Sequence, residues 1–219
     1  MQNSDTENPL RVEELLKSWG EELEIEILTG EKGLERIISS DRIQKPGLKL
    51  LDSELKLDKG TVQILGKTEI AYFDRLKPAE KMKVTGSLMS QNVPCFIVTR
   101  DLTPDKKLFE ACEKNRIPLF STKLYTGKLI SMLQEILEVR LAPFATAHGV
   151  LMDIHRLGVL LLGKSGIGKS ECALDLILRG SKLISDDIVE IRKVGPTRLV
   201  GNGPERIKHL MEIRGVGII

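Results

Sequence analysis

The chain has little of several features that would narrow its class. Only 4% of its 219 residues are aromatic, and 33 Lys and Arg stand against 31 Asp and Glu, which leaves a net charge of +2. Such a nearly equal number of basic and acidic residues argues against nucleic acid or a membrane surface as the main partner. No apolar run approaches the roughly 20 residues that cross a bilayer. The polar residues 1–10 contain no signal-peptide core, and we therefore expect a cytoplasmic protein.

Cysteine and histidine are also scarce. Cys95, Cys112 and Cys172 are odd in number and share no metal-ligand spacing, and the three histidines do not cluster with them. This pattern predicts reduced thiols and argues against a structural zinc site. The 41% hydrophobic and 29% charged residues are typical of a globular protein. The length suits one large domain or two small ones.

The first half of the chain alternates short apolar runs with amphipathic segments. A helix is predicted between Pro9 and Gly20, followed by strands at residues 23–30 and 34–39, which we expect to be neighbours. Three further apolar runs, each followed by a helical segment, predict a small parallel α/β sheet. The charges of residues 77–83 are interpreted as a solvated helix face. The strand candidates are residues 61–66, 93–99 and 117–122, and the helical candidates are residues 68–76, 104–116 and 126–141.

The pattern changes near Pro143, where we place a domain boundary within residues 138–143. This gives an N-terminal α/β domain at residues 1–137 and a second domain at residues 138–219. Residues 144–154 and 157–163 are strand candidates separated by a two-residue turn, which predicts a β-hairpin. The next helix should bury one apolar face and end at Gly180, before short strands within residues 182–195 and 197–203. That face consists of Ala173, Leu174, Ile177 and Leu178.

A glycine-rich loop links the hairpin to this helix. Its sequence, GKSGIGKS, fits the phosphate-binding pattern G-x-x-x-x-G-K-[ST] at every defined position. Its glycines let backbone N–H groups turn toward a phosphate, and the helix that follows adds a positive N-terminal dipole. We expect Lys169 to reach the β and γ oxygens of a nucleotide and Ser170 Oγ to coordinate Mg²⁺. The expected phosphate-binding residues are Gly163, Lys164, Ser165, Gly166, Ile167, Gly168, Lys169 and Ser170.

Two acidic residues that follow the glycine loop in the sequence are candidates for a proton acceptor. Asp186 and Asp187 follow Lys169 closely, and adjacent carboxylates on an extended chain point to opposite sides. One of them, close to a γ-phosphate, would be suited to take the proton from an attacking hydroxyl. A solvated Asp-Asp turn is the alternative. His148, on the strand before the loop, is either a phosphate contact or a packing residue.

Near the end of the chain, Glu212 and Arg214 are two residues apart and face the same way on extended backbone. An acid for Mg²⁺ and a guanidinium for phosphate would explain the pair. A simple surface ion pair would explain it too.

Four segments together resemble one family. FATAHGVLMDI, GKSGIGKS, LISDDIVEI and MEIRGVGII occur in the order and spacing of the bacterial HPr kinase/phosphorylase family. The resemblance covers residues 144–219, and the preceding domain is similar in length and placement to the family's variable N-terminal domain. It implies that ATP or pyrophosphate phosphorylates a serine of HPr, the small phosphocarrier protein of the sugar phosphotransferase system. In the reverse reaction, inorganic phosphate removes that group and pyrophosphate is released, which regulates carbon metabolism.

The resemblance also implies roles for single residues. His148 and Lys169 would be catalytic, and Asp187 would accept the proton during phosphorylation and return it during phosphorolysis. Ser170 and Glu212 would bind Mg²⁺. The segment that starts at Met211 is the family's signature for both reactions, and its Val216 replaces the usual Leu or Ile.

The resemblance further implies a second domain similar to phosphoenolpyruvate carboxykinase, and a homohexamer. The family continues past the signature, with a further catalytic arginine and a loop important for dephosphorylation, so this C-terminal part is expected to be absent from the chain. Two other functions stay open. One is a small-molecule kinase on a carboxykinase-like scaffold, and the other is a non-catalytic nucleotide sensor, which needs Lys169 and Ser170 but no base at Asp187.

Overall fold

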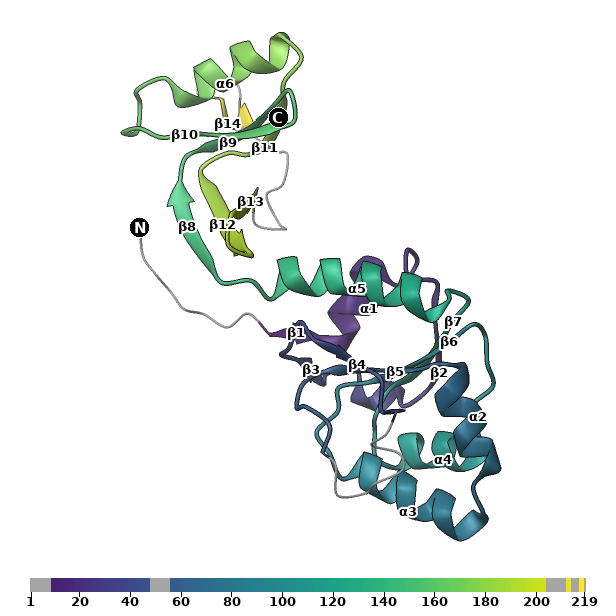
Figure 1. The fold of residues 1–219 in the computed structure, drawn as a ribbon. Helices are drawn as coiled ribbons and strands as arrows, with labels where there is room; N and C mark the ends of the chain where they lie inside the picture. The colour runs from purple at the N-terminus through teal and green to yellow at the C-terminus, as the bar shows by residue number, and fades with distance from the viewer. Residues whose placement is uncertain (1–8, 48–55, 204–211, 214–216, 219) are drawn as a thin grey trace. The chain divides into compact units, whose positions relative to one another are not determined.

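The computed structural model describes residues 9–47, 56–203, 212–213 and 217–218, the last four as strand backbone (Figure 1). The chain divides into two compact units. The N-terminal unit runs to Leu141 and the C-terminal unit begins at Ala142. Within the described residues, no helix combines the length and the apolar character needed to span a membrane.

A five-stranded sheet forms the centre of the N-terminal unit. Its strand order is β2-β7-β6-β5-β4, in which β4 to β7 are parallel and β2 runs antiparallel to β7 at one edge. The predicted parallel α/β arrangement is confirmed. The strands are β2 (Ile25–Thr29), β4 (Ile43–Gln44), β5 (Val62–Leu65), β6 (Phe96–Thr99) and β7 (Leu119–Thr122), and the short strands β1 (Leu10–Arg11) and β3 (Ile37–Ile38) pair with each other.

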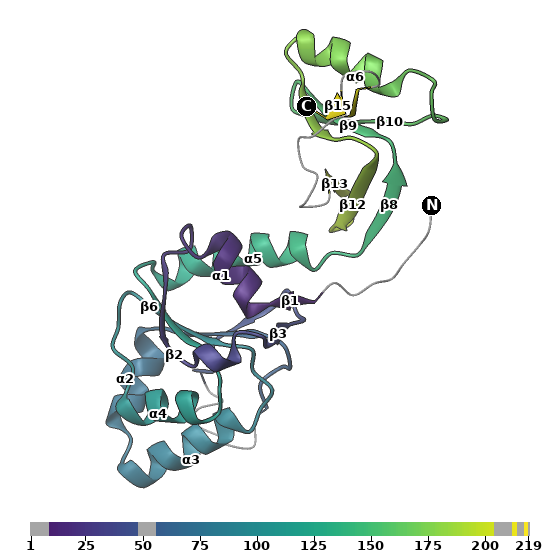
Figure 2. The same ribbon diagram turned by 180° about the vertical axis from the view of Figure 1, so that it is seen from behind.

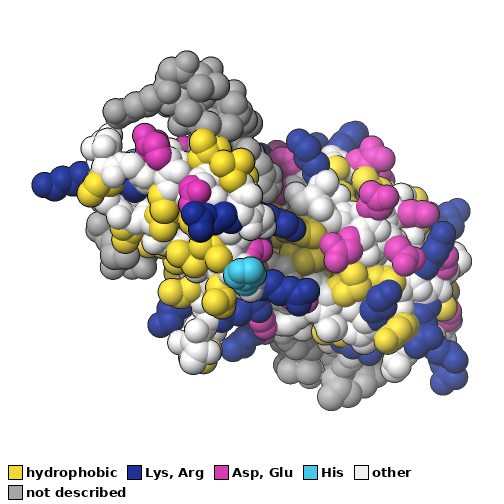
Figure 3. Space-filling view, turned by 90° about the horizontal axis from the view of Figure 1, so that it is seen from above, with side chains coloured by type: hydrophobic (Ala, Val, Ile, Leu, Met, Phe, Trp, Pro, Cys, Tyr) yellow, Lys and Arg dark blue, Asp and Glu magenta, His cyan; other side chains and the backbone are white. Residues whose placement is uncertain are grey.

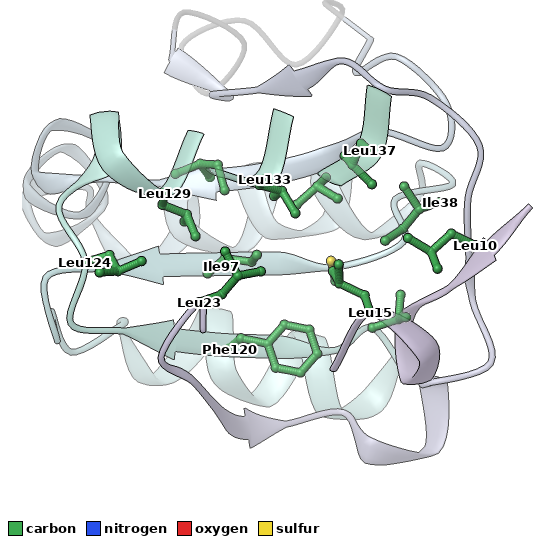
Figure 4. Close-up of a cluster of buried hydrophobic side chains, with 14 residues drawn as sticks. Leu10, Leu15, Leu23, Ile38, Ile97, Phe120, Leu124, Leu129, Leu133 and Leu137 are labelled. Atoms are coloured by element: carbon green, nitrogen blue, oxygen red, sulfur yellow. The ribbon is translucent and has the colours of Figure 1, made fainter. Parts of the chain in front are cut away.

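Helices cover both faces of this sheet (Figures 1 and 2). One face packs on α1 and α5, where Leu129, Leu133 and Leu137 of α5 belong to the same buried cluster as Ile97 and Phe120 of the sheet (Figure 4). The other face packs on α2, α3 and α4. Because both faces are buried, the central strands are continuous apolar runs in the sequence. The helices are α1 (Val12–Trp19), α2 (Lys67–Arg75), α3 (Pro78–Met89), α4 (Lys106–Lys114) and α5 (Thr126–Arg140), with a 3₁₀ turn, η1 (Glu31–Gly33).

Two details of the N-terminal unit differ from the prediction. The segment after the turn at Gly30 is not the neighbour of β2, because β3 pairs with β1 while β2 pairs with β7. Helix α1 starts at Val12 rather than directly after Pro9, because Leu10 and Arg11 are taken into the β1–β3 pair. Its predicted end at Gly20 is confirmed.

The charged face of α3 is not solvated throughout. Lys81 Nζ lies 2.6 Å from Asp105 Oδ2, and both side chains are largely buried. The ammonium holds the Asp105 carboxylate beside the start of α4, where the same carboxylate accepts a hydrogen bond from the Lys107 N–H. This pair ties α3 to α4. Elsewhere acidic and basic side chains are interspersed, as the face in Figure 3 shows.

The three thiols differ sharply in environment. Burial raises the pKa of the Cys95 and Cys112 thiols to about 12, whereas Cys172 is exposed on helix α6 (Lys169–Leu178). Because the thiolate is the reactive form, we expect only Cys172 to react rapidly with Ellman's reagent at about pH 8. All three should react after unfolding in guanidinium chloride. A second thiol that reacts rapidly with the reagent in the native protein would contradict the burial of Cys95 and Cys112.

The described residues of the C-terminal unit form two three-stranded antiparallel sheets and a two-stranded pair. One sheet has the order β10-β9-β11 and the other β13-β12-β8. Helix α6 packs on the first sheet through Ala173, Leu176 and Ile177. The strands are β8 (Phe144–His148), β9 (Val150–Ile154), β10 (Leu157–Leu161), β11 (Lys182–Ser185), β12 (Ile188–Val194) and β13 (Arg198–Asn202), and the pair is β14 (Glu212–Ile213) and β15 (Gly217–Ile218).

The predicted hairpin is confirmed as β9 and β10. Its turn residues His155 and Arg156 have φ angles of +53° and +68°, as expected for a tight two-residue hairpin turn. Gly149 divides the predicted strand at residues 144–154, so that β8 and β9 belong to different sheets. The helix face was predicted wrongly at Leu178, which is 80% exposed in the last turn, before Gly180 with φ of +93°.

Candidate active site

The strand topology brings three segments to one edge of a sheet. Strands β10 and β11 are both antiparallel to the central β9, with Leu161 opposite Val150 and Ser185 opposite Leu151. The carboxyl ends of β10 and β11 therefore lie at the same edge as the amino end of β9. The glycine loop, Gly163–Ser170, follows β10; the Asp-Asp pair follows β11; and His148 precedes β9. This edge is the candidate active site.

The glycine loop has the backbone geometry that phosphate binding requires. Gly166 and Gly168 have φ angles of +80° and +98°, in the left-handed region that glycine enters without strain. Gly168 is also the N-cap of α6. A loop of this shape turns successive N–H groups toward its concave side, and the N-terminus of α6 adds its positive dipole end. The residues from Leu162 to Ile167 are exposed and so accessible to a ligand.

Lys169 lies over this loop. Its Nζ donates hydrogen bonds to the carbonyl oxygens of Gly163 at 3.1 Å and Lys164 at 3.2 Å. The ammonium is therefore held beside the first residues of the loop, where the phosphate-binding pattern requires a positive charge. Ser170 follows in the first turn of α6, where its hydroxyl is available as a hard oxygen ligand.

His148 and Asp187 lie together. His148 Nδ1 is 3.5 Å from Asp187 Oδ1, and the two side chains are 83% and 79% exposed. The backbone explains the approach, because His148 pairs with Ile188 across β8 and β12 and the Gly149 N–H donates to the Asp187 carbonyl at 3.0 Å. An imidazole and a carboxylate thus share the sheet edge from which the glycine loop departs.

The backbone at Asp187 is not extended, which corrects the sequence interpretation. Asp187 has a φ of +76°, and the Ile188 N–H donates to the Asp186 carbonyl at 3.2 Å. A hydrogen bond across one residue closes a γ-turn, a strained conformation that persists only where its surroundings enforce it. Here the turn joins β11 in one sheet to β12 in the other. It directs the Asp187 carboxylate toward His148, while Asp186 is half-buried.

Gly149 is a site residue that the sequence analysis did not single out. A Cβ atom at this position would lie 2.6 Å from the carbonyl oxygen of Leu161, the last residue of β10. Only glycine allows the backbones of β9 and β10 to approach so closely at the active-site edge. An isolated glycine inside a strand pattern was the available signal, since it often marks such an approach.

The expected magnesium ligands are described only in part. Glu212 lies in β14, which is beside α6, but its side chain is outside the described residues, as are Met211, Arg214 and Val216. Within the described ranges, no three His, Cys, Asp or Glu side chains gather as a metal site. The donor types still fit Mg²⁺, because this ion commonly takes one or two protein oxygens together with water and substrate phosphates.

A glycine loop leading from a strand into a helix is typical of phosphate-binding proteins, and here a carboxylate and an imidazole lie at the same sheet edge. The comparisons with known proteins narrow this class. Residues 10–137 match the family model described as HPr Serine kinase N terminus, and residues 139–219 match that described as HPr Serine kinase C-terminal domain. The chain belongs to the HPr kinase/phosphorylase family.

Two proteins similar in sequence to this chain are named HPr kinase/phosphorylase. The chain is 44% identical over 199 residues to HPr kinase/phosphorylase from Bacillus subtilis, an alignment covering 91% of this chain and 64% of the relative. It is 44% identical over 210 residues to that from Geobacter sulfurreducens, covering 96% and 66%. It thus spans slightly less than two thirds of these relatives. The solved HPr(Ser) kinase/phosphatase from Coxiella burnetii is 37% identical with a TM-score of 0.33, covering 34% of this chain and 49% of that one.

Proposed function

We propose that the protein phosphorylates a serine of HPr with ATP or pyrophosphate, and removes this phosphate with inorganic phosphate to yield pyrophosphate. The observation that carries the proposal is the position of Asp187. Its carboxylate is directed at His148, 3.5 Å away, on the sheet edge from which the glycine loop departs. A nucleotide sensor would have no use for such a group, whereas phosphate transfer to a hydroxyl requires a proton acceptor.

The forward reaction assigns each residue a task. The seryl Oγ attacks the terminal phosphorus, Asp187 accepts the hydroxyl proton, and the bond from phosphorus to the bridging oxygen of ADP or phosphate breaks. Loop N–H groups and Lys169 hold the negatively charged oxygens in place. His148 binds the transferred phosphate or orients Asp187. In the reverse direction Asp187 returns the proton to the seryl oxygen.

The residues that would hold Mg²⁺ are Ser170 and Glu212. When bound, the ion would neutralise charge on the donor phosphates. We further propose that the C-terminal unit resembles phosphoenolpyruvate carboxykinase, that residues 1–137 and 138–219 are separate domains, and that the protein works as a cytoplasmic homohexamer. The glycine loop preceded by a hairpin supports the first of these proposals. The division between Leu141 and Ala142, four residues beyond the proposed boundary, supports a two-domain organisation.

The decisive experiment is a phosphate-transfer assay with purified HPr and the full-length protein. We expect HPr to gain one serine-bound phosphate with ATP or pyrophosphate, and to lose it when inorganic phosphate is added. Intact-protein mass spectrometry follows both directions, and an HPr variant with Ala at the modified serine is the control. Transfer to a metabolite but not to HPr would instead favour a small-molecule kinase. Nucleotide binding with no transfer to any acceptor would favour a sensor.

A further inference from the structure

Strand β8 carries His148 to the active site, yet its own sequence does little to fix its position. It is an edge strand that pairs only with β12 in its described sheet. Its central residues, Ala145, Thr146 and Ala147, are small, and strand register depends on specific side-chain contacts. At its His148 end, β8 continues the register of β11 on β9, in which Ser185 lies opposite Leu151, whereas the described sheet offers no such neighbouring ladder at the Phe144 end. A shift that begins at the Phe144 end would carry His148 along β12, by about 7 Å for two residues, and away from Asp187.

Arg192 supplies the missing contact at the far end of this ladder. It lies directly opposite Phe144, with its guanidinium carbon 4.7 Å from the centre of the ring. Its Nη1 donates to the Ala142 carbonyl at 3.3 Å and its Nη2 to Glu190 Oε2 at 3.0 Å. Arg192 is only 7% exposed. We call Arg192 with Phe144, Ala142 and Glu190 the arginine clamp.

The contacts of the clamp fit the observed register. A guanidinium combines a flat face for an aromatic ring with N–H groups in fixed directions, so ring and carbonyl must both be in place. After a two-residue slip, Thr146 or Ala142 would stand opposite Arg192, and neither offers a ring. The Lys193 N–H, which donates to the Pro143 carbonyl at 3.1 Å, extends the correct ladder by one bond. At the other end, the Gly149–Asp187 backbone bond closes it.

We propose that Arg192 is a positioning residue, whose clamp sets the register of β8 on β12 and thereby keeps His148 beside Asp187. The inference rests on the proposed function for the roles of His148 and Asp187 in phosphate transfer. It does not need Arg192 to touch any substrate, because the clamp lies at the end of the ladder opposite the His–Asp pair.

The test compares Arg192→Met with the wild type in the full-length protein. Methionine keeps an apolar side chain over Phe144 but removes the charge and the hydrogen bonds to Ala142 and Glu190. We expect kcat for HPr phosphorylation to fall about 10- to 100-fold, since small misplacements of catalytic groups cost this much. The dissociation constant for ATP should change less than about twofold, because the glycine loop follows β10, a strand of the other sheet. Arg192→Lys should recover part of kcat, because an ammonium can still lie over the ring.

A spectroscopic readout separates positioning from general destabilisation. The His148 ring resonances, assigned by their loss in His148→Gln, should shift in Arg192→Met toward their positions in Asp187→Asn. Arg198→Met is the matched control, because Arg198 is an exposed arginine on β13 of the same sheet. It should leave the His148 resonances and kcat unchanged. If Arg192→Met does not fold, Phe144→Leu, which removes only the ring, should give a smaller shift in the same direction.

The outcomes for the clamp and for the proposed function are distinct. Unchanged His148 resonances in folded Arg192→Met, or in Phe144→Leu where the first does not fold, would overturn the clamp whatever happens to kcat. A wild-type protein that transfers no phosphate to HPr would overturn the proposed function, while the resonances would still decide the clamp.

Discussion

Replacing Asp187 by Asn is expected to lower phosphate transfer to HPr by about 10²- to 10⁴-fold, the usual contribution of a general base. The amide cannot accept the seryl proton, whereas the carboxylate beside His148 can. Nucleotide binding should persist, because the groups assigned to hold the phosphates are the loop N–H groups and Lys169, which this replacement leaves in place. Single-turnover transfer from ATP, measured with ATP binding by calorimetry on the same preparations, tests both expectations.

Asparagine is the right replacement because of the backbone at this position. Asp187 has a φ of +76°, and Asn is among the few non-glycine residues that tolerate such a conformation. Alanine would add strain to the turn and confuse loss of the base with a shifted backbone. Asp175→Asn is the matched control, because Asp175 is an exposed carboxylate on α6 paired with Arg179. It should retain transfer within about twofold.

Two results would contradict this reasoning in different ways. Undiminished transfer in Asp187→Asn would remove Asp187 as the proton acceptor. Loss of ATP binding together with transfer would instead mean that the carboxylate acts in holding the nucleotide or its metal ion.

The central sheet of the N-terminal unit was predictable because local and global signals agree there. Strands β5, β6 and β7 are buried on both faces, so they are short apolar runs, and the segments between them have helical periodicity. The β1–β3 pair and the antiparallel placement of β2 were not predictable. Strands of two residues have no measurable period, and β2 is fixed by contacts distant in sequence, such as the hydrogen bond from Thr122 Oγ1 to the Leu23 carbonyl.

The candidate site was predictable to the extent that chemistry fixes residue types at set spacings. The glycine loop requires Gly, Lys and Ser at defined positions, and these are visible in the sequence. The γ-turn at Asp187 and the close approach at Gly149 were not visible. Both depend on how β8, β9 and β11 come together in the folded unit. The φ of Asp187 follows from its place between β11 in one sheet and β12 in the other, and local sequence does not encode this placement.

Replacing Lys169 by Met is expected to weaken both binding and transfer. The ammonium that lies 3.1 and 3.2 Å from the loop carbonyls is the cation best placed to meet the β and γ oxygens of a donor. A hydrogen bond to a charged group contributes about 1.5–3 kcal/mol, which corresponds to a roughly 10- to 150-fold weaker affinity for ATP or pyrophosphate. Transfer should fall further, by about 10²- to 10³-fold at saturating donor, because charge builds up on these oxygens in the transition state.

Two comparisons make this expectation specific to the Lys169 ammonium. Lys182→Met removes a lysine from the start of β11, at the sheet end opposite the loop, and should leave binding and transfer unchanged. Lys182 lies there opposite Asp153 in the β9–β11 ladder. Lys169→Arg keeps the charge but replaces a compact ammonium by a broad, planar fork, so it should not restore transfer. Should Lys169→Arg be fully active, charge alone would suffice and the contacts to Gly163 and Lys164 would have no part in placing it. If Lys182→Met were as defective as Lys169→Met, the loss of binding and transfer would reflect the net positive charge of the unit rather than an ammonium at the phosphate.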